Sequence, residues 1–230
     1  SYFLKLMTLF IFYKFFLSKS SFIAVTEEEK KSIKKYFPKS NVSVVRNPFE
    51  TYDRLENNIK KRFIYFGRYN KHKNLKEFLE AFIEAKPSSD WSLEIYGIDD
   101  DKSYKKQLID LVKRKKFKNY IKFYKPEFDK KKKFKIISSS WCNVLLSKSE
   151  ILSLSVLEAF SVGTQSLVNK KIFFPPWIKH KLISTSLEKD FLIKKIKHVM
   201  SQDINDKRLI KSKMIKLFDE KYEIGKEKKN

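Results

Sequence analysis

The chain has 230 residues, of which 42% are hydrophobic and 15% aromatic, so it can bury a core and global disorder is excluded. Lysine and arginine outnumber aspartate and glutamate by 51 to 27, which gives a formal net charge of +24. Almost all of the excess is lysine, which suits diffuse attraction to anions better than bidentate reading of bases. A membrane surface, nucleic acid, an anionic substrate or the codon bias of an AT-rich genome would each account for it.

The cysteine and histidine content excludes two further classes. One cysteine, Cys142, rules out an internal disulfide framework and fits a reducing compartment. It lies within an apolar run, so it is interpreted as a small core residue rather than a nucleophile. The three histidines are scattered without metal-ligand spacing, and we expect no zinc or other metal site.

The first element is an apolar stretch from Tyr2 to Leu17, interrupted by Lys5 and Lys14. A helix that spans a bilayer needs about 20 apolar residues, and this run is shorter. No small-residue cleavage site follows, so a signal peptide is also a poor fit. We expect a buried or interfacial helix here.

From Ser21 onward, short apolar strands alternate with amphipathic helices. Thr26 with Glu29, and Asn74 with Glu77, predict capped helices that run to Tyr36 and Ala85. The predicted strands are Phe22–Val25, Val42–Val45, Phe63–Phe66, Leu93–Tyr96, Ile121–Tyr124, Cys142–Leu146 and Ser166–Val168. The other predicted helices are Tyr104–Lys116, Phe128–Ile137, Ser153–Ser161, Asp190–Met200 and Asp206–Tyr222.

This alternation predicts an α/β fold, a Rossmann-like parallel sheet with helices on both faces and a ligand at the carboxyl ends of the strands. We place this domain at residues 20–189, with closing helices over 190–230. The run Lys130–Lys133 lies on a predicted helix and is expected to be a solvated face.

A first group of candidate residues follows the strand that ends at Gly67. Gly67 and Gly97 both come directly after strands, where a glycine either lets backbone approach a ligand or simply makes a turn. Arg68 and Lys73 come next, just before a predicted helix. Two cations at a helix N-terminus suit a diphosphate.

A second group contains two glutamates separated by seven residues. Glu150 is expected in the loop after the strand Cys142–Leu146, and Glu158 on the following helix among apolar residues. A carboxylate buried without partners costs several kcal/mol, so Glu158 is hydrogen-bonded, exposed or reserved for a ligand. The structural alternative is a capping box with Ser155, three residues earlier.

In this order and spacing, the two groups resemble the carboxy-terminal domain of glycosyltransferase family 4 (group 1), which are retaining enzymes of the GT-B fold. The resemblance includes a glycine, Gly163, five residues after Glu158, and it extends from about Phe22 to Tyr222. It implies that residues 1–19 are the trailing part of an amino-terminal acceptor domain that this chain lacks.

The resemblance also implies roles for individual residues. Arg68 and Lys73 would hold the donor diphosphate and stabilise charge on the leaving phosphate, and Glu150 would face the transferred sugar. Glu158 would accept hydrogen bonds from the ribose hydroxyls. The implied catalytic residues are Arg68, Lys73 and Glu150, and the implied donor-binding residues are Gly67, Arg68, Lys73, Gly97, Leu152, Ser153, Leu154 and Glu158.

The implied reaction transfers a hexose with retention from a UDP- or GDP-linked donor, with no metal or other cofactor. The implied acceptor is a glycan or lipid-linked molecule in surface polysaccharide or lipopolysaccharide synthesis. We expect a cytoplasmic protein, peripheral at the inner, anionic face of the cell membrane.

The sequence also departs from the family pattern. Ile151-Leu152-Ser153 replaces glycines and an aromatic residue, and Thr164 replaces a proline. These departures leave open a degenerate domain, or a basic non-catalytic module that binds anionic membrane or nucleic acid. No nucleic-acid-binding motif supports specific binding of nucleic acid, and no strand is followed by the Gly-x-Gly-x-x-Gly of a dehydrogenase.

Overall fold

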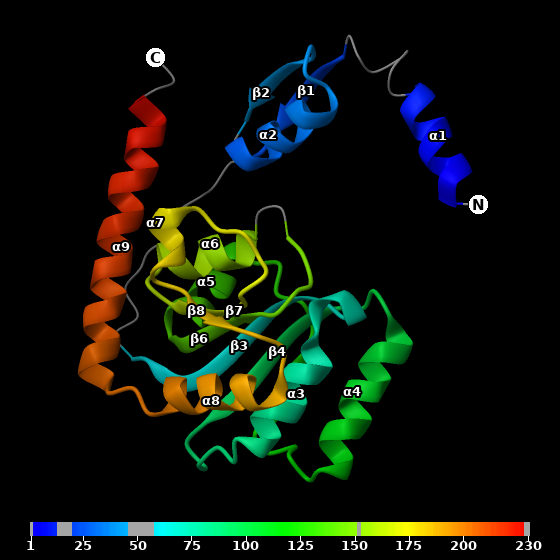
Figure 1. Ribbon diagram of the computed structural model, residues 1–230. Helices are drawn as coiled ribbons and strands as arrows, with labels where there is room; N and C mark the ends of the chain where they lie inside the picture. The colour runs from blue at the N-terminus through cyan, green and yellow to red at the C-terminus, as the bar shows by residue number, and fades with distance from the viewer. Residues whose placement is uncertain (1, 13–19, 46–57, 151–152, 228–230) are drawn as a thin grey trace. The chain divides into compact units, whose positions relative to one another are not determined.

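The computed structural model describes residues 2–12, 20–45, 58–150 and 153–227 (Figure 1). The chain divides into two compact units, Ser1–Glu50 and Thr51–Asn230, which are described separately. In the described part of the chain, no helix combines the length and apolarity that crossing a bilayer requires.

The first unit contains α1 (Tyr2–Phe12), β1 (Ser21–Ala24), α2 (Glu27–Tyr36) and β2 (Asn41–Val44). The capping box predicted for α2 is confirmed. The Thr26 hydroxyl accepts a hydrogen bond from the Glu29 amide at 3.0 Å, and the Glu29 carboxylate accepts one from the Val25 amide at 2.7 Å. The expected apolar helix is present as α1, and residues 13–17 of that prediction lie outside the described residues.

The first two strands differ from the expectation of one sheet for residues 20–189. β1 and β2 pair in parallel with each other as a two-stranded sheet and are not members of the main sheet. The reason is local, because α2 joins two sequential parallel strands as a self-contained βαβ crossover.

The second unit is built on a six-stranded parallel sheet, which confirms the predicted Rossmann-like α/β fold. Its strands are β3 (Lys60–Arg68), β4 (Ser92–Ile98), β5 (Ile121–Tyr124), β6 (Ser140–Leu145), β7 (Gln165–Asn169) and β8 (Ile183–Thr185). Their order is β5-β4-β3-β6-β7-β8. The chain builds outward from β3 to β5 and then returns to β6 beside β3, so the order reverses between β3 and β6.

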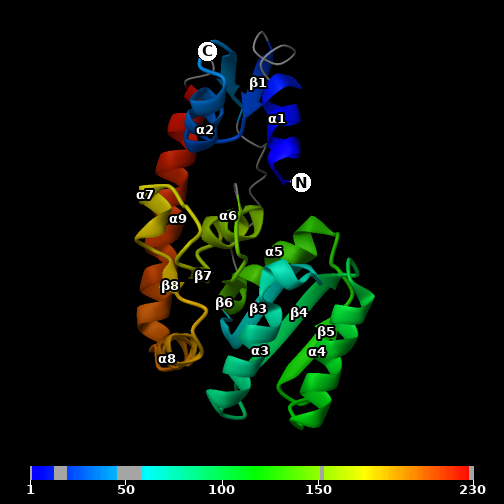
Figure 2. The same ribbon diagram turned by 45° about the vertical axis from the view of Figure 1, so that its right-hand side comes forward.

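Helices cover both faces of the sheet (Figures 1 and 2). One face carries α3 (Leu75–Glu84), α4 (Lys102–Arg114) and α8 (Lys189–Met200), with the 3-10 turn η2 (Lys71–Lys73) before α3. The other face carries α5 (Lys130–Ser138), α6 (Leu154–Ser161) and α7 (Pro176–Lys179). The closing helix α9 (Ile204–Glu227) packs on α6.

Each face has its own aromatic core, because successive strand residues point to opposite sides. On the α3 side, the ring of Phe63 packs against Phe78 and Phe82 at centroid distances of 5.8 and 5.7 Å. On the other side, Phe160 packs against Phe218 of α9 at 6.4 Å. Cys142 is fully buried as predicted, and burial raises the pKa of its thiol to about 11.

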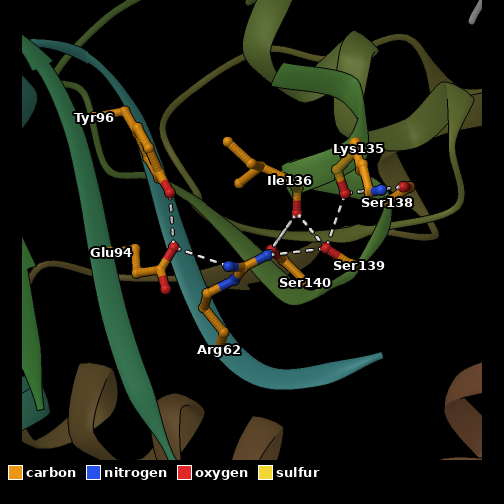
Figure 3. A network of polar contacts seen from close by, with 8 residues as sticks. All are labelled: Arg62, Glu94, Tyr96, Lys135, Ile136, Ser138, Ser139 and Ser140. Atoms are coloured by element: carbon orange, nitrogen blue, oxygen red, sulfur yellow. Dashed lines mark hydrogen bonds and ion pairs between the residues drawn. The ribbon is translucent and has the colours of Figure 1, made fainter. Parts of the chain in front are cut away.

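A buried polar network crosses the start of the sheet (Figure 3). Arg62 donates to the Glu94 carboxylate at 2.8 Å, to the Ser140 hydroxyl at 2.9 Å and to the Ile136 carbonyl at 2.9 Å. Glu94 also accepts from the Tyr96 hydroxyl at 2.8 Å. The network therefore connects β3, β4 and the end of α5 around one buried guanidinium.

Asn74 is the N-cap residue of α3, as predicted, but the prediction that its side chain caps the helix is wrong. Its backbone is left-handed at φ 50°, a region that asparagine tolerates, and its side chain makes no cap hydrogen bond. Instead the Asn74 amide donates to the Leu146 carbonyl at 2.6 Å. The Lys148 amide donates to the His72 carbonyl at 2.9 Å. These bonds tie the loop after β3 to the loop after β6, across the point where strand order reverses.

Candidate functional site

A cleft of about 380 Å³ opens at the carboxyl edge of the main sheet, where open α/β sheets bind their ligands. It is lined from β3, β4, the loop before α5, α5 itself, the end of β6 and the start of α6. The lining includes most residues predicted for the site, namely Gly67, Lys73, Glu150, Ser153, Leu154 and Glu158. Leu152 lies outside the described residues.

Lys73 and Glu150 form an ion pair in this cleft. The Lys73 ammonium donates to the Glu150 carboxylate at 2.5 Å, and the two side chains are 17% and 18% exposed. Lys73 ends η2, which brings it to the cleft directly before α3. An ammonium held at the mouth of a cleft by a single carboxylate can exchange that carboxylate for an anionic ligand.

Glu158 is half-buried in the cleft, with one carboxylate oxygen paired and the other without a partner among the described residues. Its Oε1 accepts a hydrogen bond from the Lys133 ammonium at 2.7 Å. Its Oε2 is buried and has no hydrogen-bond partner among the described residues. A buried acceptor without a partner costs roughly 1–3 kcal/mol, so this oxygen is available to a hydroxyl or amide donor that the described residues do not supply.

The capping-box alternative for Glu158 is wrong. Ser153, not Ser155, is the N-cap residue of α6, and α6 has no side-chain cap hydrogen bond. The Ser155 hydroxyl lies 3.1 Å from the Ser153 hydroxyl instead. The first amides of α6 therefore have no side-chain partner at the N-cap and lie beside the cleft, in a position that suits an anion.

Arg68 is not among the residues that line the cleft. Its side chain is 60% exposed and lies 3.8 Å from the Asp100 carboxylate, which also accepts from the Asn70 amide at 2.8 Å. An exposed ion pair of this length is worth about 1 kcal/mol or less. The guanidinium can therefore turn to an anionic ligand at small cost.

The two predicted glycines are explained by neighbouring tyrosines. A Cβ at Gly97 would lie 2.2 Å from the ring of Tyr69, and one at Gly67 would lie 2.6 Å from the Tyr65 hydroxyl. Gly67 and Gly97 are register partners on β3 and β4, but only Gly67 lines the cleft. Gly97 makes room for the buried Tyr69 ring rather than for a ligand.

Sequence reasoning missed an aromatic ladder and one lysine. Phe66 stacks on Tyr96 with centroids 4.7 Å apart, and Tyr96 stacks on Tyr124 at 4.9 Å, because the three residues are register partners on β3, β4 and β5. Phe66 and Tyr96 line the cleft, as does Lys133. An aromatic residue at the same place in three predicted strands was a usable signal for the ladder.

The cleft thus presents the Lys73 ammonium and the first amides of α6, which suit an anion, the free Oε2 of Glu158, which suits a hydroxyl, and the aromatic rings of Phe66 and Tyr96. Across the described ranges, no three His, Cys, Asp or Glu side chains gather as a candidate metal site.

Comparison with known proteins gives a family match. The family model described as "Glycosyl transferases group 1" matches residues 49–214. A comparison with curated proteins finds no match.

Solved structures share the fold. The chain is similar to the C-terminal domain of a glycosyl transferase group 1 family protein (LpcC) from Francisella tularensis, with 24% identity, coverage of 71% of this chain and 88% of that one, and a TM-score of 0.62. It is similar to a variant of S. aureus TarM in complex with fondaparinux, alpha-GlcNAc-glycerol and UDP, with 17% identity, coverage of 87% and 40%, and a TM-score of 0.71.

The lipopolysaccharide outer core galactosyltransferase WaaB is a third similar structure, with 19% identity, coverage of 85% of this chain and 57% of that one, and a TM-score of 0.60. At these identities the likeness shows the fold alone. The chain spans 40% of the TarM chain and 57% of the WaaB chain.

Proposed function

The chain belongs to the group 1 glycosyl transferases, and from that premise we propose that it is the donor-binding part of a retaining enzyme that moves a hexose from a nucleoside diphosphate to an acceptor. The proposed donor is a UDP- or GDP-linked sugar, and no metal or other cofactor takes part. TarM, which shares the fold, was solved with UDP bound, and this supports a nucleotide ligand.

The observation that carries the proposal is the free Oε2 of Glu158. It is a buried acceptor in a cleft that otherwise presents a cation, the first amides of a helix and aromatic rings. A ribose hydroxyl supplies the missing donor. The diphosphate then lies toward Lys73 and the amides of Ser153 and Leu154, since those groups attract anions.

Lys73 exchanges Glu150 for a phosphate oxygen when the donor binds, and the exposed Arg68 turns from Asp100 to the same group. Both cations stabilise the negative charge that develops on the leaving diphosphate. The released Glu150 carboxylate lies beside the sugar, where it orients the ring or stabilises positive charge at the anomeric carbon. The bond from that carbon to the diphosphate breaks, a bond to the acceptor oxygen forms on the same face, and the acceptor proton passes to the diphosphate.

Thermal unfolding of the 230-residue chain with UDP and with GDP tests the proposal. A nucleotide at 100 times its dissociation constant adds about 2.7 kcal/mol to the free energy of unfolding, which raises the melting temperature. Glu158→Gln should lose that increase. Glu84→Gln is the matched control, because Glu84 is an exposed residue at the far end of α3, paired with Lys189.

A folded chain that neither nucleotide stabilises would contradict the proposal. The basic, non-catalytic module would then be the better explanation. An increase that survives Glu158→Gln would place the nucleotide elsewhere on the chain.

The proposal extends to a longer enzyme that has an acceptor domain, because this chain spans about half the length of its longer structural relatives. We expect the chain alone to bind nucleotide but to turn over poorly without an acceptor domain. The proposed acceptor is a glycan or lipid-linked molecule of surface polysaccharide or lipopolysaccharide, met at the cytoplasmic face of the membrane. The charge of +24 and the name of WaaB support this step. Binding to anionic vesicles that does not weaken with added salt would count against it.

A further inference from the structure

Lys133 differs from the other lysines of its run. The sequence predicts a solvated face for Lys130–Lys133, and Lys131 and Lys132 are indeed exposed. Lys133 is half-buried, with 23% of its side chain exposed, and it lines the cleft. It therefore contributes a positive charge to the site, and the proposed reaction assigns no role to that charge.

Two contacts from different elements fix the Lys133 ammonium. It donates to Oε1 of Glu158 on α6 at 2.7 Å. It also lies 5.4 Å from the ring centroid of Phe66 on β3, in reach of a cation–π interaction. Phe66 is itself stacked on Tyr96. An ammonium held from two sides in this way has little freedom to move.

The pair leaves Glu158 with one available acceptor. A glutamate carboxylate turns easily about its last bond, so an unpaired Glu158 would present its two oxygens in many orientations. Because Lys133 holds Oε1, the carboxylate is fixed and Oε2 alone is left for a ligand. The ammonium also supplies the opposite charge that a carboxylate only 16% exposed requires.

We propose that Lys133 is a positioning residue for the nucleotide. It holds the Glu158 carboxylate so that Oε2 is directed at a ribose hydroxyl, and it acts on the ligand only through Glu158. This inference rests on the proposed function, in which Glu158 binds the ribose. It gives Lys133 a role distinct from Lys73, whose ammonium exchanges its carboxylate for phosphate.

The test compares a ribonucleotide with its 2′,3′-dideoxy form, which has no hydroxyl for Glu158. Dissociation constants are measured by calorimetry for UDP, GDP and their dideoxy forms with the 230-residue chain, Lys133→Met and Lys133→Arg. Lys132→Met is the control, since it removes the same charge from an exposed neighbour. Melting temperatures without ligand show that each variant is folded.

Lys133→Met should weaken binding of the ribonucleotide by about 10-fold, the effect of losing one charge-assisted hydrogen bond. It should leave binding of the dideoxy form unchanged. Lys133→Arg should restore most of the loss, because arginine keeps the charge and the donors. In the Glu158→Gln background, Lys133→Met should have little further effect, because the two residues act as one unit.

An equal loss for both forms of the nucleotide would overturn the inference, because it would mean that Lys133 attracts the diphosphate directly. Unchanged ribonucleotide binding in a folded Lys133→Met chain would also overturn it, while the proposed function would stand. If the unmodified chain binds none of the four nucleotides, the proposed function fails and this inference fails with it.

Discussion

Lys207 on α9 offers a sharp test of how burial acts on charge in this fold. Its side chain is 1% exposed. Its ammonium donates to the Gln165 side chain at 2.9 Å and lies 5.9 Å from the ring centroid of Trp141. No carboxylate pairs with it among the described residues. Burial and, to a smaller degree, the neighbouring charge of Lys211 lower the pKa of Lys207 from 10.5 to about 8.

The sign of the effect follows from the two pKa values. Between about pH 8 and pH 10.5 the unfolded chain binds the proton at this lysine and the folded chain does not. The protonated lysine therefore destabilises the fold at pH 7, and the penalty is relieved as the pH rises through this window. The gap between the two pKa values corresponds to roughly 3 kcal/mol at neutral pH.

Lys207→Met should therefore raise the free energy of unfolding at pH 7 by about 1–3 kcal/mol, since a buried methionine of similar length carries no charge. Gln165 keeps a second donor, the Gln202 amide at 3.4 Å. Urea unfolding at pH 7 and pH 9.5 measures the gain, with Lys213→Met, an exposed residue of the same helix, as the control. At pH 9.5 roughly half of the gain should be gone.

Comparing the variant with the unmodified chain at each pH removes the contributions of titrating groups that do not interact with Lys207. A variant that is less stable at pH 7 would refute the reasoning, because the contact with Gln165 would then outweigh the cost of burial. A gain that is the same at both pH values would show that the methionine packs better, not that a charge was removed.

Two further substitutions test the fold. Gly163→Ala should lower the free energy of unfolding by about 2–4 kcal/mol, because φ of Gly163 is +74° and the new Cβ would lie 2.6 Å from the Lys211 carbonyl oxygen. Urea unfolding measures this, and a loss under about 1 kcal/mol would contradict the reasoning. Arg62→Met should cost about 3–5 kcal/mol by leaving the half-buried Glu94 carboxylate without its counter-charge, whereas Arg62→Met with Glu94→Gln should recover much of the loss. Equal losses in the single and double variants would show that Glu94 needs no counter-charge.

The secondary structure was largely predictable because the signals are local. The apolar runs that became β3, β4 and β6 and the capping box of α2 depend on residues within a few positions of one another. The elements η2, α7 and β8 were not predicted, because they are three or four residues long and carry too little periodicity.

Errors arose where a side chain finds its partner far along the chain. Asn74 has the local pattern of a helix cap, but its partner is the Leu146 carbonyl, 72 positions away. Strand order also depends on distant contacts, so β1 and β2 were expected in the wrong sheet. Local rules identify an element, but they do not identify what it packs against.

The candidate site shows the same division. Lys73, Glu150 and Glu158 were found from their spacing, and the structure brings all three to one cleft. Lys133 was assigned to a solvated face, because only the packing of α5 against α6 separates it from the lysines beside it. Arg68 was found by the same spacing rule, but the structure pairs it with Asp100 outside the cleft lining.

The cleft contains two lysine–carboxylate pairs that the proposed reaction treats differently. The four charges of these two pairs cancel, so the pairs themselves add no net positive charge to the cleft. The pair of Lys73 and Glu150 has to open when the diphosphate arrives, and its opening releases a cation for the phosphate and a carboxylate for the sugar together. The pair of Lys133 and Glu158 has to stay closed, because an unpaired Glu158 would lose the orientation that directs Oε2 at the ribose. Removal of Lys73 should therefore weaken the contact with the diphosphate, whereas removal of Lys133 should weaken the contact with the ribose.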